Sequence, residues 1–284
     1  MREDPDLLGL GRLAKYPRVA AAAERLPPAF DRLVRPRRFQ QRRLVTQTLD
    51  DAGLLGRFER GEPLPAGYGV GLDERVVEYP WLLAQRPSGR TLDAGSVLNH
   101  AHILPRFLPR LASLDVVTLA PEREAFPDQG VSYVYADLRE LPYRDNVFDT
   151  VVCVSTLEHV GMDNTAYGSD APRAADPGVE RSRAARELRR VTAPGGRLLV
   201  TVPVGDPDDL GWIMPFSDRD LAALVAAVEP ASETRTVFRY TREGWQVSDA
   251  ASVAGARYRT PSLEPQPDDL AARARAVACV ALTV

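Results

Sequence analysis

The sequence predicts an α/β protein built on an open, mostly parallel sheet. Two short apolar runs, residues 131–135 and 148–154, each end in polar residues, and a third apolar run covers residues 197–202. The near-continuous second run is typical of a strand that is covered on both faces. Between the second and third runs, residues 180–191 carry apolar side chains at helical spacing. A strand, a helix and a strand in this order predict a right-handed crossover between parallel strands.

The other elements follow from the same patterns. Residues 74–85 read as a helix that leads to a first strand at 91–94, and a second helix is expected from about Asn99. Pro194, Gly195 and Gly196 end the helix before the third run and turn the chain back into the sheet. The remaining expected elements are a strand at 115–119, a helix at 218–228 and strands at 233–240 and 276–284.

Pro and Gly break residues 1–75 into short helical pieces, so we expect a helical N-terminal extension there and a single domain over 76–284. With 284 residues and 44% hydrophobic side chains, the chain can bury a full core. Its net charge of -3 gives no reason to expect nucleic acid or an anionic membrane as a partner.

No apolar stretch is long enough to span a bilayer, and the N-terminus lacks the apolar core of a signal peptide. The two cysteines, Cys153 and Cys279, both fall inside expected strands. Buried thiols are typical of a reducing compartment, so we expect a cytoplasmic protein.

A set of short motifs follows the expected strands and helices along the chain. They are Asp137, Leu141-Pro142-Tyr143, Asn146, Phe148-Asp149, Leu157-Glu158-His159-Val160 and Arg190-Val191 with Pro194-Gly195-Gly196. With them the chain resembles the class I S-adenosylmethionine-dependent methyltransferases, above all the small-molecule group typified by the ubiquinone and menaquinone methyltransferases. The resemblance covers about residues 90–204. It implies a Rossmann-like, seven-stranded, mostly parallel sheet with helices on both faces, S-adenosylmethionine as cofactor and a role in biosynthesis.

The resemblance also implies a cofactor loop after the first strand, with an acidic residue followed by glycines at alternate positions. Asp93 and Gly95 match that pattern, and Ser96 lies beside them in the loop. Val97 and Asn99 stand where the second and third glycines are expected. Asn99 is able to adopt a left-handed conformation or to cap a helix, whereas Val97 is poorly suited to the first of these.

Further cofactor contacts are implied at the ends of the next strands. The acidic residue that binds the ribose hydroxyls aligns with Ala120, and Glu122 is either its replacement or a surface glutamate at a helix start. Asp137 aligns with the acid that contacts the adenine amino group, with the Leu138 backbone beside it; the alternative for Asp137 is a cap or turn residue. Ser155 follows the strand at 148–154 and completes the expected cofactor set.

The candidate catalytic residues are His159 and Asp163. Methyl transfer from a sulfonium is an in-line displacement, so an imidazole near neutral pKa suits removal of a proton from an acceptor hydroxyl. The alternative for His159 is an architectural role under the cofactor. The other two histidines, His100 and His102, have neither the spacing nor the flanking acid of a metal site, and no metal is expected.

The polar loop after His159 is the expected substrate region. Asn164 and Tyr167 suit a hydroxyl-rich ligand, although both also suit an ordinary solvated turn. Trp212 and Tyr240 are candidates for a pocket wall and a lid, with core packing as the alternative. We therefore expect methyl transfer to a small polar metabolite, first of all to an oxygen of a sugar or secondary-metabolite scaffold. The oligomeric state is left open, a homodimer included.

The altered glycine loop and the shifted ribose acid support a second hypothesis. The chain would then have a methyltransferase fold with weak or no cofactor binding, and would act as a partner subunit or a non-methylating enzyme. A nicotinamide-dependent oxidoreductase is a poorer alternative, because the first strand is followed by Gly95 alone and not by G-x-G-x-x-G.

Overall fold

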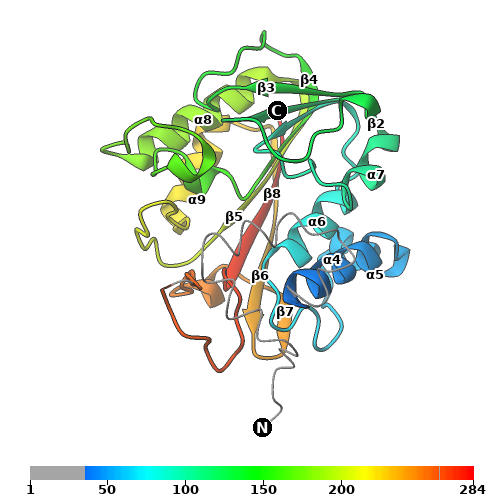
Figure 1. Ribbon diagram of the computed structural model, residues 1–284, viewed down its shortest axis with the longest axis vertical. Helices are drawn as coiled ribbons and strands as arrows, with labels where there is room; N and C mark the ends of the chain where they lie inside the picture. Colours follow the sequence, from blue (N-terminus) through cyan, green and yellow to red (C-terminus); the bar gives the residue numbers. More distant parts are fainter. Residues whose placement is uncertain (1–35, 262) are drawn as a thin grey trace.

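The described part of the chain is organised around one mixed sheet of eight strands. The computed structural model describes residues 36–261 and 263–284. The strand order is β3-β2-β1-β4-β5-β8-β6-β7 (Figure 1). The strands are β1 (Gly89–Ala94), β2 (Leu111–Thr118), β3 (Val131–Tyr135), β4 (Phe148–Val154), β5 (Thr192–Pro203), β6 (Ser232–Thr241), β7 (Gly244–Ser248) and β8 (Ala276–Thr283). Strands β1 to β5 pair in parallel, and β8 runs antiparallel to both β5 and β6.

Helices cover both faces of this sheet, as predicted. The α-helices are α4 (Pro36–Leu49), α5 (Ala52–Arg60), α6 (Arg75–Ala84), α7 (Leu104–Phe107), α8 (Pro177–Val191) and α9 (Asp218–Val228). The 3-10 turns are η2 (Leu108–Arg110), η3 (Pro127–Gln129), η4 (Leu157–His159), η5 (Thr165–Tyr167) and η6 (Ala251–Val253). Helices α4 to α7 pack on one face and α8 and α9 on the other (Figure 1).

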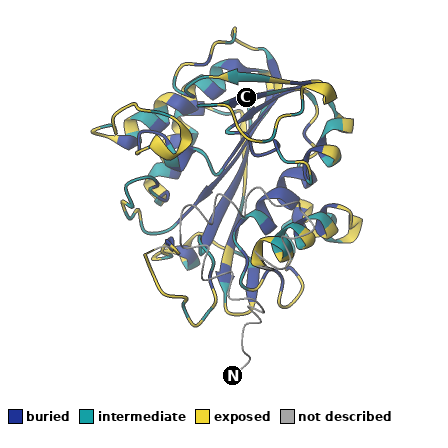
Figure 2. Cartoon of the chain, viewed as in Figure 1, coloured by how far each residue is buried: buried dark blue, intermediate teal, exposed yellow. Residues whose placement is uncertain are grey.

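The central strands lie at the centre of the hydrophobic core, between the helices on the two faces of the sheet. Figure 2 shows them buried along most of their length, with exposed residues concentrated on helices and loops. The predicted crossover is confirmed, because α8 connects β4 to its parallel neighbour β5. Cys153 and Cys279 are buried and free, as expected; the cytoplasmic placement inferred from them stays a prediction. Among residues 36–261 and 263–284, no helix is both long and apolar enough to cross a membrane.

The predicted helix from about Asn99 is much shorter in the structure. Helix α7 begins only at Leu104 and ends at Phe107, followed directly by η2. Pro105 and Pro109 supply no backbone N–H to extend a regular helix. Asn99 does not cap it, because its side-chain oxygen accepts a hydrogen bond from the Tyr133 hydroxyl and its amide nitrogen donates to Glu122 and to the Glu124 carbonyl.

The sheet has one strand more than the seven predicted. The additional strand is β7, which forms a hairpin with β6. The Tyr68 carbonyl oxygen accepts a hydrogen bond from the Trp245 backbone N–H at 2.8 Å, and Gly67 donates to the Glu243 carbonyl at 3.1 Å. The hairpin is therefore fixed to the segment before α6, a contact between distant parts of the sequence that strand periodicity does not reveal.

The predicted N-terminal extension is described only from residue 36 onward, and residues 1–35 lie outside the described part. Helices α4 and α5 contribute to the core of the sheet; the ring centroids of Phe58 and Phe238, for example, are 5.5 Å apart. The predicted boundary at residue 75 falls at the start of α6, and the division of the chain there stays a prediction.

Substitution of Gly244 tests how strongly the β6–β7 hairpin depends on its contact with Tyr68. Its φ is 99°, and a Cβ atom there would overlap the Tyr68 carbonyl group. Gly61 also has a positive φ, 64°, but open space around it. We expect Gly244→Ala to lower the free energy of unfolding by about 3 kcal/mol or more, and the control Gly61→Ala by about 1 kcal/mol. Urea denaturation measures both, and equal losses would contradict the packing argument.

Candidate cofactor and acceptor site

A cavity of about 210 Å³ lies at the carboxyl ends of β1 to β4. The chain order of the sheet reverses between β1 and β4, and in open α/β sheets ligands bind at such a point. The volume is below the roughly 300–1,000 Å³ of most ligand pockets, so a nucleoside-sized ligand would also occupy the open mouth. Side chains and backbone that line it include Arg75, Gly95, Ser96, Glu122, Asp137, Leu138, Arg139, Ser155, Thr156, His159, Asn164 and Tyr167.

Asp93 organises the loop after β1 from below and does not line the cavity. It is fully buried, and its carboxylate accepts hydrogen bonds from the backbone N–H groups of Val97 at 3.1 Å and Leu98 at 2.7 Å. Burial raises the pKa of Asp93 to about 7 in spite of these two bonds. The acidic residue of the predicted cofactor loop therefore sets the shape of the loop.

The substitutions in this loop leave the cavity open. Ser96, not position 97, adopts the left-handed conformation, with a φ of 62°. Val97 packs into the core and is 4% exposed, so its side chain does not enter the cavity. Gly95 is required where it stands, because a Cβ atom there would overlap the Thr156 hydroxyl group across the β1–β4 boundary.

Glu122 lies at the mouth of the cavity in a fixed orientation. One carboxylate oxygen accepts a hydrogen bond from the Ser96 hydroxyl, and the other accepts one from the Asn99 amide at 2.8 Å. Asn99 is buried, and its own oxygen accepts a hydrogen bond from the Tyr133 hydroxyl at 2.8 Å. Asn99 thus positions Glu122 instead of lining the cavity, and the Glu122 carboxylate keeps acceptor capacity for further donors.

Asp137 and Leu138 lie together at the end of β3. The Arg139 guanidinium holds Asp137 through two hydrogen bonds of 2.9 and 2.7 Å, and the Arg139 backbone N–H donates to the same carboxylate at 2.8 Å. Burial raises the pKa of Asp137, but the bonds from Arg139 outweigh it and the net pKa is lowered. Within the described residues, the Leu138 backbone N–H has no hydrogen-bond partner and is available to a ligand.

Arg75 is a cavity residue that the sequence did not single out. It extends from α6, and one guanidinium nitrogen donates to Glu78 at 2.5 Å. The other Glu78 oxygen accepts hydrogen bonds from the hydroxyls of Ser155 and Thr201, both at 2.6 Å. The sequence did contain a signal for Arg75, namely a glutamate within the apolar stretch of residues 76–84. A buried carboxylate requires charged or hydrogen-bonding partners, and Arg75 is a nearby cation.

His159 has a defined tautomer. Its Nδ1 lies 2.8 Å from the Trp212 carbonyl oxygen, which only accepts, so Nδ1 carries the proton and Nε2 has the lone pair. Nε2 has no hydrogen-bond partner among residues 36–261 and 263–284. The ring stacks on Trp212 and meets Tyr167 edge-on, each with centroids 5.2 Å apart. Burial lowers the pKa of His159 to about 4, so the imidazole is neutral at pH 7.

The structure brings only some of the other predicted residues to the cavity. Asn164 lines it and donates to the His159 carbonyl at 3.0 Å. Asp163 is exposed outside the cavity, where its carboxylate accepts bonds from the Thr165 N–H and hydroxyl that lower its pKa. Tyr240 is 3% exposed, and its hydroxyl is bonded to Gly71 and to the Asp269 carbonyl in the core.

Comparison with known proteins finds methyltransferases that match the part of the chain around this cavity. Residues 94–200, from the end of β1 into β5, match the family model described as a methyltransferase domain. A tRNA (carboxymethyluridine(34)-5-O)-methyltransferase of Arabidopsis thaliana is 30% identical over 105 residues, which are 37% of this chain and 22% of that protein. The ubiquinone/menaquinone biosynthesis C-methyltransferase UbiE of Proteus mirabilis strain HI4320 is 34% identical over 104 residues, 34% of each chain. The matches thus span 22% and 34% of these two relatives' lengths.

One solved structure that is similar to this chain is the N-methyltransferase NodS of Bradyrhizobium japonicum WM9 in complex with S-adenosyl-L-homocysteine. It is 15% identical, and the match covers 86% of this chain and 98% of that chain with a TM-score of 0.44. The family match falls on the strands and loops that form the cavity. Residues 94–200 therefore match a methyltransferase domain, and in this part the chain is similar to S-adenosylmethionine-dependent methyltransferases such as UbiE.

Proposed function

We propose that the chain transfers a methyl group from S-adenosylmethionine to a small polar metabolite, most directly to an oxygen of a sugar or secondary-metabolite scaffold. When bound, S-adenosylmethionine supplies an electrophilic methyl group on a sulfonium. The observation that carries the proposal is the cavity at the β1–β4 boundary. Apart from Arg75, its lining comes from the family-matched region, and it presents a different polar group for each part of this cofactor.

The groups in the cavity fit the cofactor by their chemistry. The Glu122 carboxylate would accept hydrogen bonds from the two ribose hydroxyls, and its fixed orientation lowers the entropic cost of doing so. Asp137 and the free Leu138 N–H would hold the donor and acceptor edges of the adenine. Arg75, whose guanidinium uses one nitrogen for Glu78, would bind the carboxylate of the amino-acid part.

His159 is the group best suited to accept the proton of the acceptor hydroxyl. Its Nε2 lone pair is available at neutral pH, and the Trp212 carbonyl holds the ring in the required tautomer. Asn164 and Tyr167 lie on the same side of the cavity and would bind further polar groups of the acceptor. Asp163 is the weaker candidate base, because it is exposed outside the cavity.

The alternative function, a methyltransferase fold that binds the cofactor weakly or not at all, is favoured by one contact. Arg139 already occupies both oxygens of Asp137, so adenine has to share that carboxylate with a guanidinium. The protein would then act as a partner subunit or in non-methylating chemistry. Direct measurement of cofactor binding separates the two functions.

Calorimetric titration with S-adenosylmethionine and S-adenosylhomocysteine tests the proposal. We expect micromolar dissociation constants, and at least about a tenfold loss of affinity in Asp137→Ala because the adenine contact is removed. Asp128→Ala, which changes an exposed aspartate in η3, is the matched control and should bind like the wild type. A folded wild-type protein that binds neither ligand would reject the proposal and support the alternative function.

The role of Arg75 is tested with two ligands that differ only in the amino-acid part. We expect Arg75→Gln to weaken S-adenosylhomocysteine binding by about tenfold or more, because a charged hydrogen bond to the carboxylate is lost. Binding of 5′-methylthioadenosine, which lacks that carboxylate, should change by less than about twofold. An equal loss for both ligands would show that Arg75 only supports the shape of the cavity through Glu78.

We expect His159→Ala to lower turnover by about 100-fold or more, on an acceptor found by screening hydroxylated metabolites, because the general base is removed. The dissociation constant of S-adenosylhomocysteine should stay within about threefold. Asp163→Asn is the matched control and should keep wild-type turnover, since Asp163 lies outside the cavity. Unchanged turnover in His159→Ala would remove His159 from the mechanism.

Protonation of His159 makes the stability of the fold depend on pH. Since burial lowers the pKa of His159 in the folded state to about 4 from an unfolded value near 6.5, its contribution to stability is present above pH 6.5 and is lost as the pH falls toward 4. NMR titration of the histidine ring signals measures this pKa directly, with His159→Ala to assign the signal. A value near 6.5 in the folded protein would contradict the buried, neutral base.

A further inference from the structure

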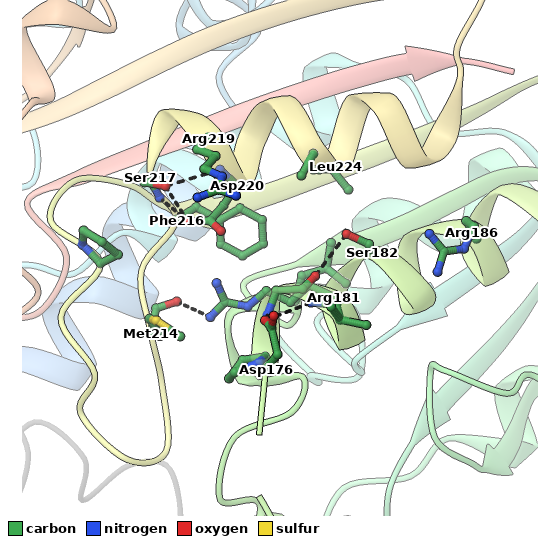
Figure 3. Close-up of a pocket in the computed structure, with 16 residues that line it drawn as sticks. Asp176, Arg181, Ser182, Arg186, Met214, Phe216, Ser217, Arg219, Asp220 and Leu224 are labelled. Carbon is green, nitrogen blue, oxygen red and sulfur yellow. Dashed lines mark hydrogen bonds between the residues drawn. The ribbon is translucent and has the colours of Figure 1, made fainter. Parts of the chain in front are cut away.

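A second cavity, of about 560 Å³, lies between the first turns of α8 and α9 (Figure 3). Its lining shares no residue with the cofactor cavity. Leu157, the first residue of η4, and Met214, in the loop after β5, form part of its wall, so the cavity lies behind the turn that carries His159. The cavity is within the size range of small-molecule sites.

The charged side chains in this lining are three arginines and two aspartates: Arg181, Arg186, Arg219, Asp176 and Asp220. Both aspartates are already used as helix caps. Asp176 accepts the backbone N–H groups of Gly178 and Val179, and Asp220 accepts that of Ser217. In the described part of the chain, the exposed Arg186 and Arg219 have no hydrogen bond and no ion pair.

Arg181 differs from the other two arginines because it is only 4% exposed. Its Nη2 donates to the carbonyl oxygens of Glu158 at 3.1 Å and Met214 at 2.5 Å, and its guanidinium lies 4.6 Å from the Phe216 ring centroid. Its Nε is buried with no hydrogen-bond partner. Nη1 also has no partner among the described residues but is not sealed from solvent, so it is reached from the cavity.

No carboxylate neutralises this buried guanidinium by direct contact. Within the described residues Arg181 forms no ion pair, and burial lowers its pKa. Asp220 and Glu158 attract the guanidinium from a distance and partly oppose this lowering of its pKa. Burial raises the pKa of the Glu158 carboxyl to about 8, so Glu158 is mostly neutral at pH 7 and Asp220 is the nearer source of negative charge. A buried cation without a paired anion is unfavourable, and an anion bound in the cavity would offset that cost.

We propose that this cavity binds a small phosphorylated molecule, with Arg181, Arg186 and Arg219 as the cationic groups that attract and hold it. A phosphate dianion accepts hydrogen bonds from several guanidinium groups at once, which a single carboxylate does less well. The rest of the cavity has room for the organic part of the ligand. This site does not depend on the proposed methyl transfer, because it involves other residues.

The occupied site would also brace the acceptor side of the molecule. Arg181 holds the carbonyl of Glu158, which directly precedes His159, and the carbonyl of Met214, two residues after Trp212. Figure 3 shows the Arg181 side chain extending from α8 toward Met214. Arg181 is therefore a positioning residue for the His159–Trp212 pair, whether or not a ligand is present.

Calorimetric titration of the full chain with inorganic phosphate, at constant ionic strength, tests the site. We expect saturable binding that weakens about tenfold in Arg186→Ala and in Arg219→Ala, and is lost in the double variant. Both residues are exposed, so these variants should keep the wild-type fold, which circular dichroism checks. Arg239→Ala, an exposed arginine of β6 outside this cavity, is the matched control and should bind phosphate like the wild type.

Three outcomes would overturn the proposal. The first is no phosphate binding by the wild type up to about 10 mM, which is weaker than any useful site. The second is an equal loss in Arg239→Ala, which would indicate non-specific attraction to a positive surface. The third is binding of acetate as tight as that of phosphate, which would contradict the phosphate class of ligand. These outcomes concern phosphate and acetate binding alone. They therefore test this proposal whether or not the chain binds S-adenosylmethionine.

Discussion

The buried carboxylate of Glu78 is the interaction on which the site depends. Removing a carboxylate from water is costly, and Glu78 is fully buried. Three hydrogen bonds offset that cost: one from Arg75 on α6, one from Ser155 at the end of β4 and one from Thr201 on β5. The same bonds fix Arg75 at the cavity and hold Ser155 in a left-handed conformation with a φ of 42°. One side chain before β1 therefore joins three elements around the cofactor cavity.

The loop after β1 shows how far the sequence alone could go. The sequence correctly predicted a strand that contains Asp93 and is followed by Gly95, since both depend on local pattern. By the resemblance, the second glycine position falls on Val97, which is poorly suited to a left-handed conformation; in the structure the left-handed non-glycine residue of this loop is Ser96. That shift turns Val97 into the core. Side-chain direction in such a loop depends on which residue takes the positive φ, and a sequence pattern does not specify this.

Residues that act through distant partners were the hardest to assign. Asn99 was expected in the cofactor loop, but its partners Glu122 and Tyr133 come from the segments after β2 and in β3. Tyr240 was expected in a lid, but its hydroxyl is bonded by Gly71 and Asp269, far away in the sequence. In both cases the residue type was informative about polarity, and only the three-dimensional contacts showed what the polar group binds.

The adjacent residues Glu158 and His159 show how burial sets the charge of the acceptor side. Burial disfavours the charged form of each group, so the pKa of the Glu158 carboxyl rises to about 8 and that of the His159 imidazole falls to about 4. At pH 7 both are then mostly neutral. An anionic Glu158 beside His159 would stabilise the imidazolium and attract cationic acceptors. In the proposed methyl transfer, a neutral pair would leave a hydrogen-bond acceptor at Nε2 without a negative charge on the adjacent Glu158, which would suit an uncharged hydroxylated acceptor better than an ammonium group.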